Sequence, residues 1–300
     1  MKKKTYLIAL MAMALTLGSC SDNENGIGGE TSKYITVSTS IGNMTRVATD
    51  ANGGQTFEEG DEISVYAWIG APTVAPETRE RVVNNAINKL TNGSWVATPQ
   101  MLWKNNRDKH YFIGVYPTAA ISDLSAGEYI FDVNKQTESD LLVAVNKDGL
   151  SYNVDEQQTV PLTFTHVMAK LVVNLTYKNQ WGGIPTVEKV VVGNAAKEAT
   201  INYLTKVVTP STTAKEDFSL PEITENTKYV SVIIPQEDVK QLTIVIGGKN
   251  FVYDNGTPFK LESGKITTVN LEVGRDEIKL GDVKITDWED GSTFGGEALN

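Results

Sequence analysis

The feature that most constrains this 300-residue chain is a series of short runs rich in Val, Ile, Thr and Tyr, bounded by Gly, Asn, Asp and Pro. Apolar and polar residues alternate within these runs, which is typical of a strand with one buried face. In the first run, Ile35, Val37 and Ile41 share one face, and hydroxyl side chains occupy the other. The remaining predicted strands cover residues 62–68, 110–116, 128–133, 140–145, 159–165, 169–177, 186–192, 229–235, 241–246, 249–253, 265–273 and 283–288.

Only one segment is predicted to be helical. In residues 76–90, apolar side chains such as Val83, Ala86 and Leu90 recur at the spacing of a helix face. Many strands and almost no helix indicate an all-β protein with sandwich or barrel architecture.

The length of the chain allows two domains. With 300 residues and 40% hydrophobic composition, the chain can bury two cores of ordinary size. We expect a boundary after the turn-rich segment that ends at residue 158. This places an N-terminal β-sandwich domain at residues 34–158 and a C-terminal one at residues 159–300.

The first residues have the pattern of a secretory signal. Three lysines at positions 2–4 precede an apolar stretch from Tyr6 to Leu17, which is shorter than the roughly 20 residues of a membrane-spanning helix. The end of this stretch, Leu17-Gly18-Ser19-Cys20, resembles a bacterial lipobox. We therefore expect residues 1–19 to be a lipoprotein signal peptide and Cys20 to carry lipid. The alternative is an ordinary signal peptide with an incidental Cys at its end.

Acyl chains on Cys20 would anchor the protein, because two or three chains bind a membrane far more firmly than one. Residues 20–33 are polar, acidic and rich in Gly, and we interpret them as a flexible tether. The acidic residues after Cys20 loosely resemble a signal that directs lipoproteins to the outer face of the outer membrane. Cys20 is also the only cysteine, so the exported domains have neither a disulfide nor a cysteine metal site.

The charge of the chain argues against nucleic acid as a partner. The formal net charge is −10, and it falls to about −13 when the three lysines of the leader are removed. A field of this sign repels phosphate backbones, and no basic stripe interrupts it.

The sequence offers little for catalysis, and we expect no catalytic residues, no metal and no cofactor. His110 and His166 are the only histidines, and no His-Glu-x-x-His, Cys pair or Gly-x-Ser-x-Gly elbow occurs. Both histidines are better explained as hydrogen-bonded structural residues than as bases. Acidic turns at residues 58–62 and 287–290 could offer oxygens to calcium, but neither fits an EF-hand loop. The five tryptophans could form a carbohydrate platform or fill a core.

Several segments taken together resemble the fimbrillin family of Bacteroidetes, whose members build type V fimbriae or are related surface lipoproteins. The resemblance implies two tandem transthyretin-like β-sandwich domains. It also implies export as a lipoprotein and, in polymerising members, cleavage by a trypsin-like protease at an Arg after the first strand. The segments that carry it, behind the lipobox, are residues 57–66, 111–117, 136–144, 164–171 and 285–288.

The resemblance assigns roles to particular residues. Cleavage is expected between Arg46 and Val47, although Arg46 is equally well explained as a surface residue in a loop. Loss of the strand that carries Ile35, Val37 and Ile41 would open a groove for the terminal strand of another subunit, which is a case of β-strand addition. The possible donor strand has four apolar residues, but its alternation breaks at Gly281-Asp282, so it could instead complete its own domain. These four residues are Ile278, Leu280, Val283 and Ile285.

Three functions follow from these observations. The first is a structural stalk or tip subunit of a type V fimbria that serves surface adhesion, with other fimbrial subunits, an Arg-specific protease and the outer membrane as partners. The second is a non-polymerising outer-membrane surface lipoprotein that binds a glycan or a host or bacterial surface ligand. The third, a hydrolase, would depend on His166.

Overall fold

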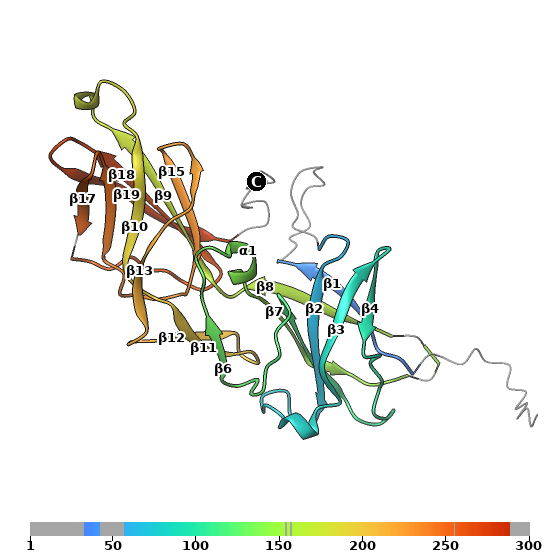
Figure 1. Ribbon diagram of the computed structural model, residues 1–300. Helices are drawn as coiled ribbons and strands as arrows, with labels where there is room; N and C mark the ends of the chain where they lie inside the picture. Colours follow the sequence, from blue (N-terminus) through green and yellow to red (C-terminus); the bar gives the residue numbers. More distant parts are fainter. Residues whose placement is uncertain (1–32, 43–56, 154, 157, 255, 289–300) are drawn as a thin grey trace, which may run out of the picture.

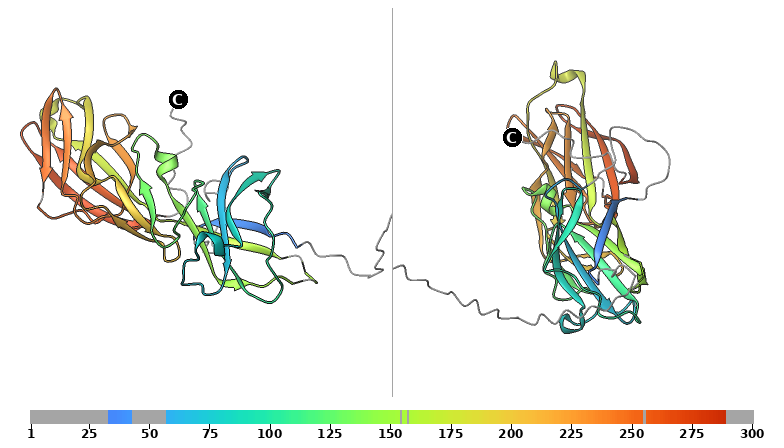
Figure 2. Two further views of the ribbon diagram at one scale, coloured as in Figure 1. Left: turned by 60° about the horizontal axis from the view of Figure 1, so that its bottom comes forward. Right: turned by 90° about the vertical axis from the view of Figure 1, so that its right-hand side faces the viewer.

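The computed structural model describes residues 33–42, 57–153, 155–156, 158–254 and 256–288. These residues form an all-β structure of two lobes that lie end to end (Figures 1 and 2). The only helices among them are one turn of α-helix, α1 (Gln136–Ser139), and two short 3-10 turns, η1 (Thr78–Glu80) and η2 (Asn179–Trp181). None of the helices in the described ranges is long and apolar enough to cross a membrane.

The first lobe is a seven-stranded sheet in the order β1-β8-β7-β5-β2-β3-β4. All its pairings are antiparallel except that of β1 with β8, which is parallel. The sheet curls until its two edges approach each other, and a bridge between Tyr34 and Leu102 joins them. Its strands are β1 (Thr36–Ile41), β2 (Glu62–Ile69), β3 (Val83–Thr91), β4 (Ser94–Thr98), β5 (His110–Tyr116), β7 (Leu142–Leu150) and β8 (Thr159–His166).

The second lobe is built from a four-stranded sheet in the order β13-β10-β16-β17 and a five-stranded sheet in the order β14-β15-β9-β18-β19. The apolar residues of both sheets belong to one core. The four-stranded sheet contains β10 (Val187–Ala196), β13 (Lys215–Ser219), β16 (Gln241–Ile246) and β17 (Lys249–Asp254). The five-stranded sheet contains β9 (Ala169–Tyr177), β14 (Glu222–Thr224), β15 (Lys228–Ile233), β18 (Lys265–Val273) and β19 (Ile278–Asp287).

A third, small sheet joins the lobes. Its middle strand, β11 (Glu198–Asn202), pairs with β12 (Val207–Pro210) on one side and with β6 (Gly127–Ile130) on the other. Since β6 lies between β5 and β7 in the chain, the first part of the sequence contributes a strand to the second lobe (Figure 1). Buried side chains of the seven-stranded sheet, including Tyr66 and Trp68, pack in the same core as the second lobe.

The fold confirms the all-β prediction, but the predicted helix at residues 76–90 is wrong. The segment contains the short turn η1, and from Val83 onward it is strand β3. A bulge explains the misleading spacing: Val65 pairs with Ala86, whereas Ala67 pairs with Val83, and Asn85 takes the left-handed conformation with φ 55°. An extra residue therefore brings side chains three apart onto the same buried face, which imitates a helical period.

The chain leaves the first sheet at the end of β8 and enters the second lobe with β9. Strand β8 pairs with β1 and β7, so it belongs to the seven-stranded sheet. Sheet membership thus changes between His166 and Ala169, whereas the domain division expected after residue 158 stays a prediction.

Candidate functional site

The candidate site is the slot that holds β1. On one side, β1 runs parallel to β8 from the Thr36–Thr159 pair to the Ile41–Phe164 pair. On the other side, the segment before β1 meets residues 101–103: the Ile35 amide donates to the Met101 carbonyl oxygen at 3.0 Å. Backbone groups on both sides therefore fix the beginning of β1.

The inward side chains of β1 fill the core of the curled sheet. Ile35, Val37 and Ile41 are 1%, 6% and 8% exposed. Each buried aliphatic side chain of this size contributes about 1.5–3 kcal/mol relative to an exposed one. The slot is thus an apolar groove that needs an occupant. Its buried walls include Ile63, Val65, Met101, Trp103, Phe112, Val160, Leu162 and Phe164.

Polar contacts set the register of β1 but contribute less to its stability. The indole Nε1–H of Trp95 donates to Thr39 Oγ1 at 3.0 Å, and Ser40 Oγ donates to Thr163 Oγ1 at 3.2 Å. These groups are partly solvated, so each bond contributes only about 1 kcal/mol. Apolar packing therefore dominates the retention of β1.

Three of the predicted site residues lie outside the described residues: Cys20, Arg46 and Val47. The described part of the chain stops at Gly42, directly after β1, and resumes at Phe57. Their predicted roles in lipidation and cleavage stay predictions.

The possible donor strand is β19, an edge strand of the five-stranded sheet that pairs antiparallel with β18. A bulge at Gly281 lets Leu280 oppose Leu271 while Asp282 opposes Asn270. The break in alternation therefore leaves all four apolar residues on one face, opposite Val273, Leu271, Val269 and Thr267. This apolar face is not fully covered, however, because Val283 and Ile285 are 40% and 39% exposed. The donation of this strand stays a prediction.

The bulge of β19 is held by a polar ladder across three strands. Asn174 Nδ2 on β9 donates to Asn270 Oδ1 on β18 at 2.7 Å, and Asn270 Nδ2 donates to Asp282 Oδ1 at 2.7 Å. This chain of hydrogen bonds fixes the register of β19 in its own sheet.

The end of β19 is anchored by Trp288, which is 9% exposed. Its ring stacks on the ring of His166 with centroids 4.0 Å apart and an interplanar angle of 5°. His166 Nδ1 lies 2.8 Å from Asp140 Oδ1, so the stack is fixed from the first lobe. Lys170 Nζ lies 5.3 Å from the centroid of the Trp288 ring, and burial lowers the pKa of Lys170 to about 8.

Replacing Trp288 with Ala should release the end of β19. The expected loss is about 3 kcal/mol in the free energy of unfolding, because a large buried aromatic side chain is removed. Thr286→Ala is the matched control, since Thr286 is an exposed residue of the same strand. Urea unfolding and hydrogen exchange of β19 test this prediction, and equal stability of the two variants would contradict it.

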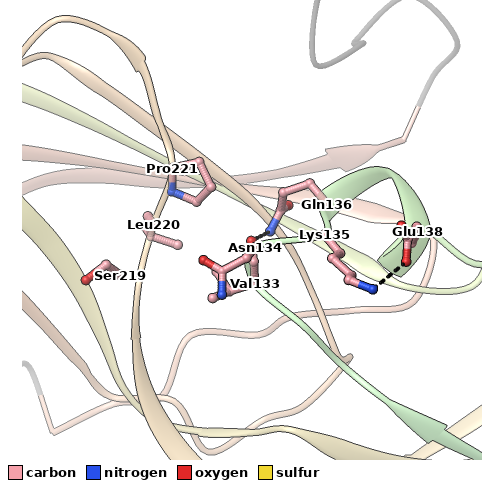
Figure 3. Close-up of a pocket in the computed structure, with 8 residues that line it drawn as sticks. All are labelled: Val133, Asn134, Lys135, Gln136, Glu138, Ser219, Leu220 and Pro221. Carbon is pink, nitrogen blue, oxygen red and sulfur yellow. Dashed lines mark hydrogen bonds and ion pairs between the residues drawn. The ribbon is translucent and has the colours of Figure 1, made fainter. Parts of the chain in front are cut away.

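None of the His, Cys, Asp and Glu side chains of the described residues form a group of three that could hold a metal ion. One open pocket of about 570 Å³ lies beside α1 (Figure 3). In it Lys135 pairs with Glu138 at 3.2 Å, and Gln136 Nε2 donates to the Val133 carbonyl oxygen at 2.8 Å. Trp68, Trp103 and Trp288 fill cores, whereas Trp95 and Trp181 are partly exposed.

Sequence reasoning missed the segment from Met101 to Trp103, which forms the second wall of the slot. Met101 and Trp103 are 2% and 8% exposed, whereas Leu102 between them is 42% exposed. Three alternating residues after a turn were the only signal, which is shorter than a recognisable strand pattern.

Comparison with known proteins places this geometry in a family. The model of a family described as fimbrillin-like matches residues 45–288. A candidate cell adhesion protein of Bacteroides uniformis has a TM-score of 0.61 at 19% identity, over 78% of this chain and 93% of that protein. A candidate cell adhesion protein of Bacteroides ovatus has a TM-score of 0.62 at 18% sequence identity, over 85% of this chain and 98% of that protein. A fimbrial protein of Bacteroides vulgatus has a TM-score of 0.52 at 12% sequence identity, over 84% of this chain and 99% of that protein. The search of curated protein sequences gave no match.

Proposed function

Since the chain belongs to the fimbrillin-like family and is therefore a fimbrial or adhesion subunit of the cell surface, we propose that it assembles by exchange of β1 for a strand of another subunit. It acts in this proposal as a structural stalk or tip subunit of a type V fimbria and not as an enzyme. The outer membrane holds its precursor through lipid on Cys20 until cleavage at Arg46.

The observation that carries this proposal is the position of β1. Its inward side chains fill an apolar groove, and within the described ranges its strand pairing is the parallel one with β8 and not an antiparallel hairpin. Arg46 lies between β1 and β2 in the sequence, so a cut there leaves β1 attached to the rest of the protein only by noncovalent contacts. A strand with a better apolar face can then replace it, as in β-strand addition.

One face of β19 carries as many apolar side chains as there are inward positions on β1 and the residue before it. Counting the bulge, Ile278, Leu280, Val283 and Ile285 occupy four successive positions on one face of β19. The corresponding positions of β1, together with the residue directly before it, carry the three aliphatic residues Ile35, Val37 and Ile41 and one hydroxyl residue, Thr39. A donor with this pattern would therefore add apolar contact at the place where β1 has a partly exposed polar side chain.

Cleavage tests the proposal directly. We expect an Arg-specific protease to convert the Cys20→Ser chain, which cannot be acylated, into a product that begins at Val47 and forms oligomers. Arg46→Lys is the matched control, because it keeps the charge and removes the cleavage site. Mass spectrometry and size-exclusion chromatography provide the readouts.

A stable monomer after complete cleavage at Arg46 would contradict strand exchange. Cleavage of the Arg46→Lys chain to the same product would contradict the assigned site. If neither chain is cut under native conditions, the polymerising role is overturned.

The anchoring of β19 favours a second candidate, a non-polymerising surface lipoprotein that binds a glycan or a host ligand. A strand whose end is stacked on His166 is retained in its own sheet rather than donated. Trp181 is the tryptophan to test, because it lies partly exposed beside Arg275, whose guanidinium carbon is 5.6 Å from the ring centroid. Glycan-array binding that is lost in Trp181→Ala would support this candidate.

A further inference from the structure

The second wall of the β1 slot depends on a histidine. We call residues 101–104 the clasp, because their backbone holds the segment that leads into β1. The Met101 carbonyl oxygen accepts from the Ile35 amide at 3.0 Å, and the Trp103 amide donates to the Lys33 carbonyl oxygen at 3.2 Å. The last residue of the clasp, Lys104, donates its backbone N–H to Nε2 of His110 at 3.1 Å.

His110 lies fully buried at the start of β5 and supports the clasp from inside. Its ring meets Trp103 edge to face, with centroids 5.0 Å apart and an interplanar angle of 90°. Its Nδ1 lies 3.1 Å from the carbonyl oxygen of Asp108. The ring thus bridges the loop between Lys104, the last residue of the clasp, and Asp108, two residues before β5 begins.

The partners of the ring define one tautomer. The backbone N–H of Lys104 can only donate, so Nε2 must accept and carries no proton. Nδ1 then carries the proton and donates to Asp108 O. Both ring nitrogens are satisfied in the neutral form, and a second proton would set Nε2–H against the N–H of Lys104.

We propose that protonation of His110 releases the clasp and loosens the beginning of β1, so that mild acid primes this strand for exchange. The release of the clasp is inferred only from the contacts of His110. The effect of this release on assembly rests on the proposed function.

The direction of the pH effect follows from the surroundings of the ring. Burial lowers the pKa of His110 below its usual value, while the carbonyl oxygen and the charge of Asp108 and the backbone of Leu150 on β7 oppose this shift. Lys104 adds a further lowering effect, whereas Trp103, which contacts the ring, and Ile69 and Leu150, which pair with His110 on the neighbouring strands, are uncharged. The open state therefore binds the proton more tightly, and opening increases as the pH falls below about 6.5.

Hydrogen exchange of the full-length Cys20→Ser chain between pH 5.0 and 7.5 tests this inference. After correction for intrinsic exchange rates, we expect opening at residues 33–41 to increase by up to about tenfold per pH unit as the pH falls. The His110→Gln variant should show no such slope, because Gln can accept from Lys104 but does not titrate. Since the chain has only two histidines, His166→Asn is the matched control, and it should keep the slope.

The pH dependence of opening in these three chains either supports the proposal or overturns it. A slope that persists in His110→Gln, or that disappears only in His166→Asn, would overturn the assignment to His110. A flat profile in the wild-type chain would overturn the proposal that protonation of His110 releases the clasp, even if His110→Gln is less stable, because the comparison concerns the slopes of opening against pH. If the slope is present but Arg46 cleavage yields no oligomers, His110 keeps its role and strand exchange fails.

Discussion

Ile35→Ala should lower the free energy of unfolding by about 3 kcal/mol and increase local opening of β1 by about 100-fold. Ile35 is 1% exposed and packs in the core of the curled sheet, where a shorter side chain leaves a cavity. The Ile35 amide also donates to the carbonyl oxygen of Met101, the first residue of the clasp. Loss of the side chain therefore weakens both the packing and the backbone contact that hold the beginning of β1.

The matched control is Ser38→Ala on the same strand, whose side chain is exposed. This variant should change stability by less than about 0.5 kcal/mol. Urea unfolding followed by circular dichroism and hydrogen exchange of residues 33–41 provide the measurements. Similar opening of β1 in both variants would mean that apolar packing does not hold the strand.

Gly114→Ala should destabilise the first lobe by about 2 kcal/mol, although it adds only a methyl group. A Cβ at Gly114 would lie 2.6 Å from Cζ of Phe164 and 3.1 Å from Cδ1 of Leu162. Both side chains are fully or almost fully buried, so the ring must move against a packed core. Since Phe164 pairs with Ile41, the shift reaches β1.

Two further variants separate this clash from a general preference for glycine. Gly193→Ala on β10 is the control, because its Cβ would approach Gln241 no closer than 3.3 Å, and we expect a loss below about 1 kcal/mol. Phe164→Leu in the Gly114→Ala background should cost less than the sum of the two single changes. Additive losses in thermal unfolding would show that Gly114 and Phe164 do not compete for space.

Local patterns predicted several of the strands that are dense in aliphatic and aromatic residues. The intervals 110–116, 241–246 and 265–273 match β5, β16 and β18 at both ends. Short or polar strands escaped, for example β13, in which Phe218 is the only buried residue. Strand β3 was mistaken for a helix because its bulge adds a residue between two inward positions.

Partner choice could not be predicted, because alternation says which face of a strand is buried but not which strand lies beside it. Nothing in residues 127–130 indicates that β6 pairs with β11 rather than with its neighbours in the sequence. The same holds for β1 and β8. The sequence therefore predicted only the inward residues of the candidate site. Its second wall, and the position of His110 beside that wall, became apparent from the structure.

The parallel pairing of β1 with β8 also has a consequence for the order of folding. The partners Thr36 and Thr159 lie 123 positions apart, so β1 has no parallel partner until most of the first lobe has been made. Contacts this distant in sequence form late, because loop closure must precede them. Every newly made chain thus passes through a stage in which its own slot stands open.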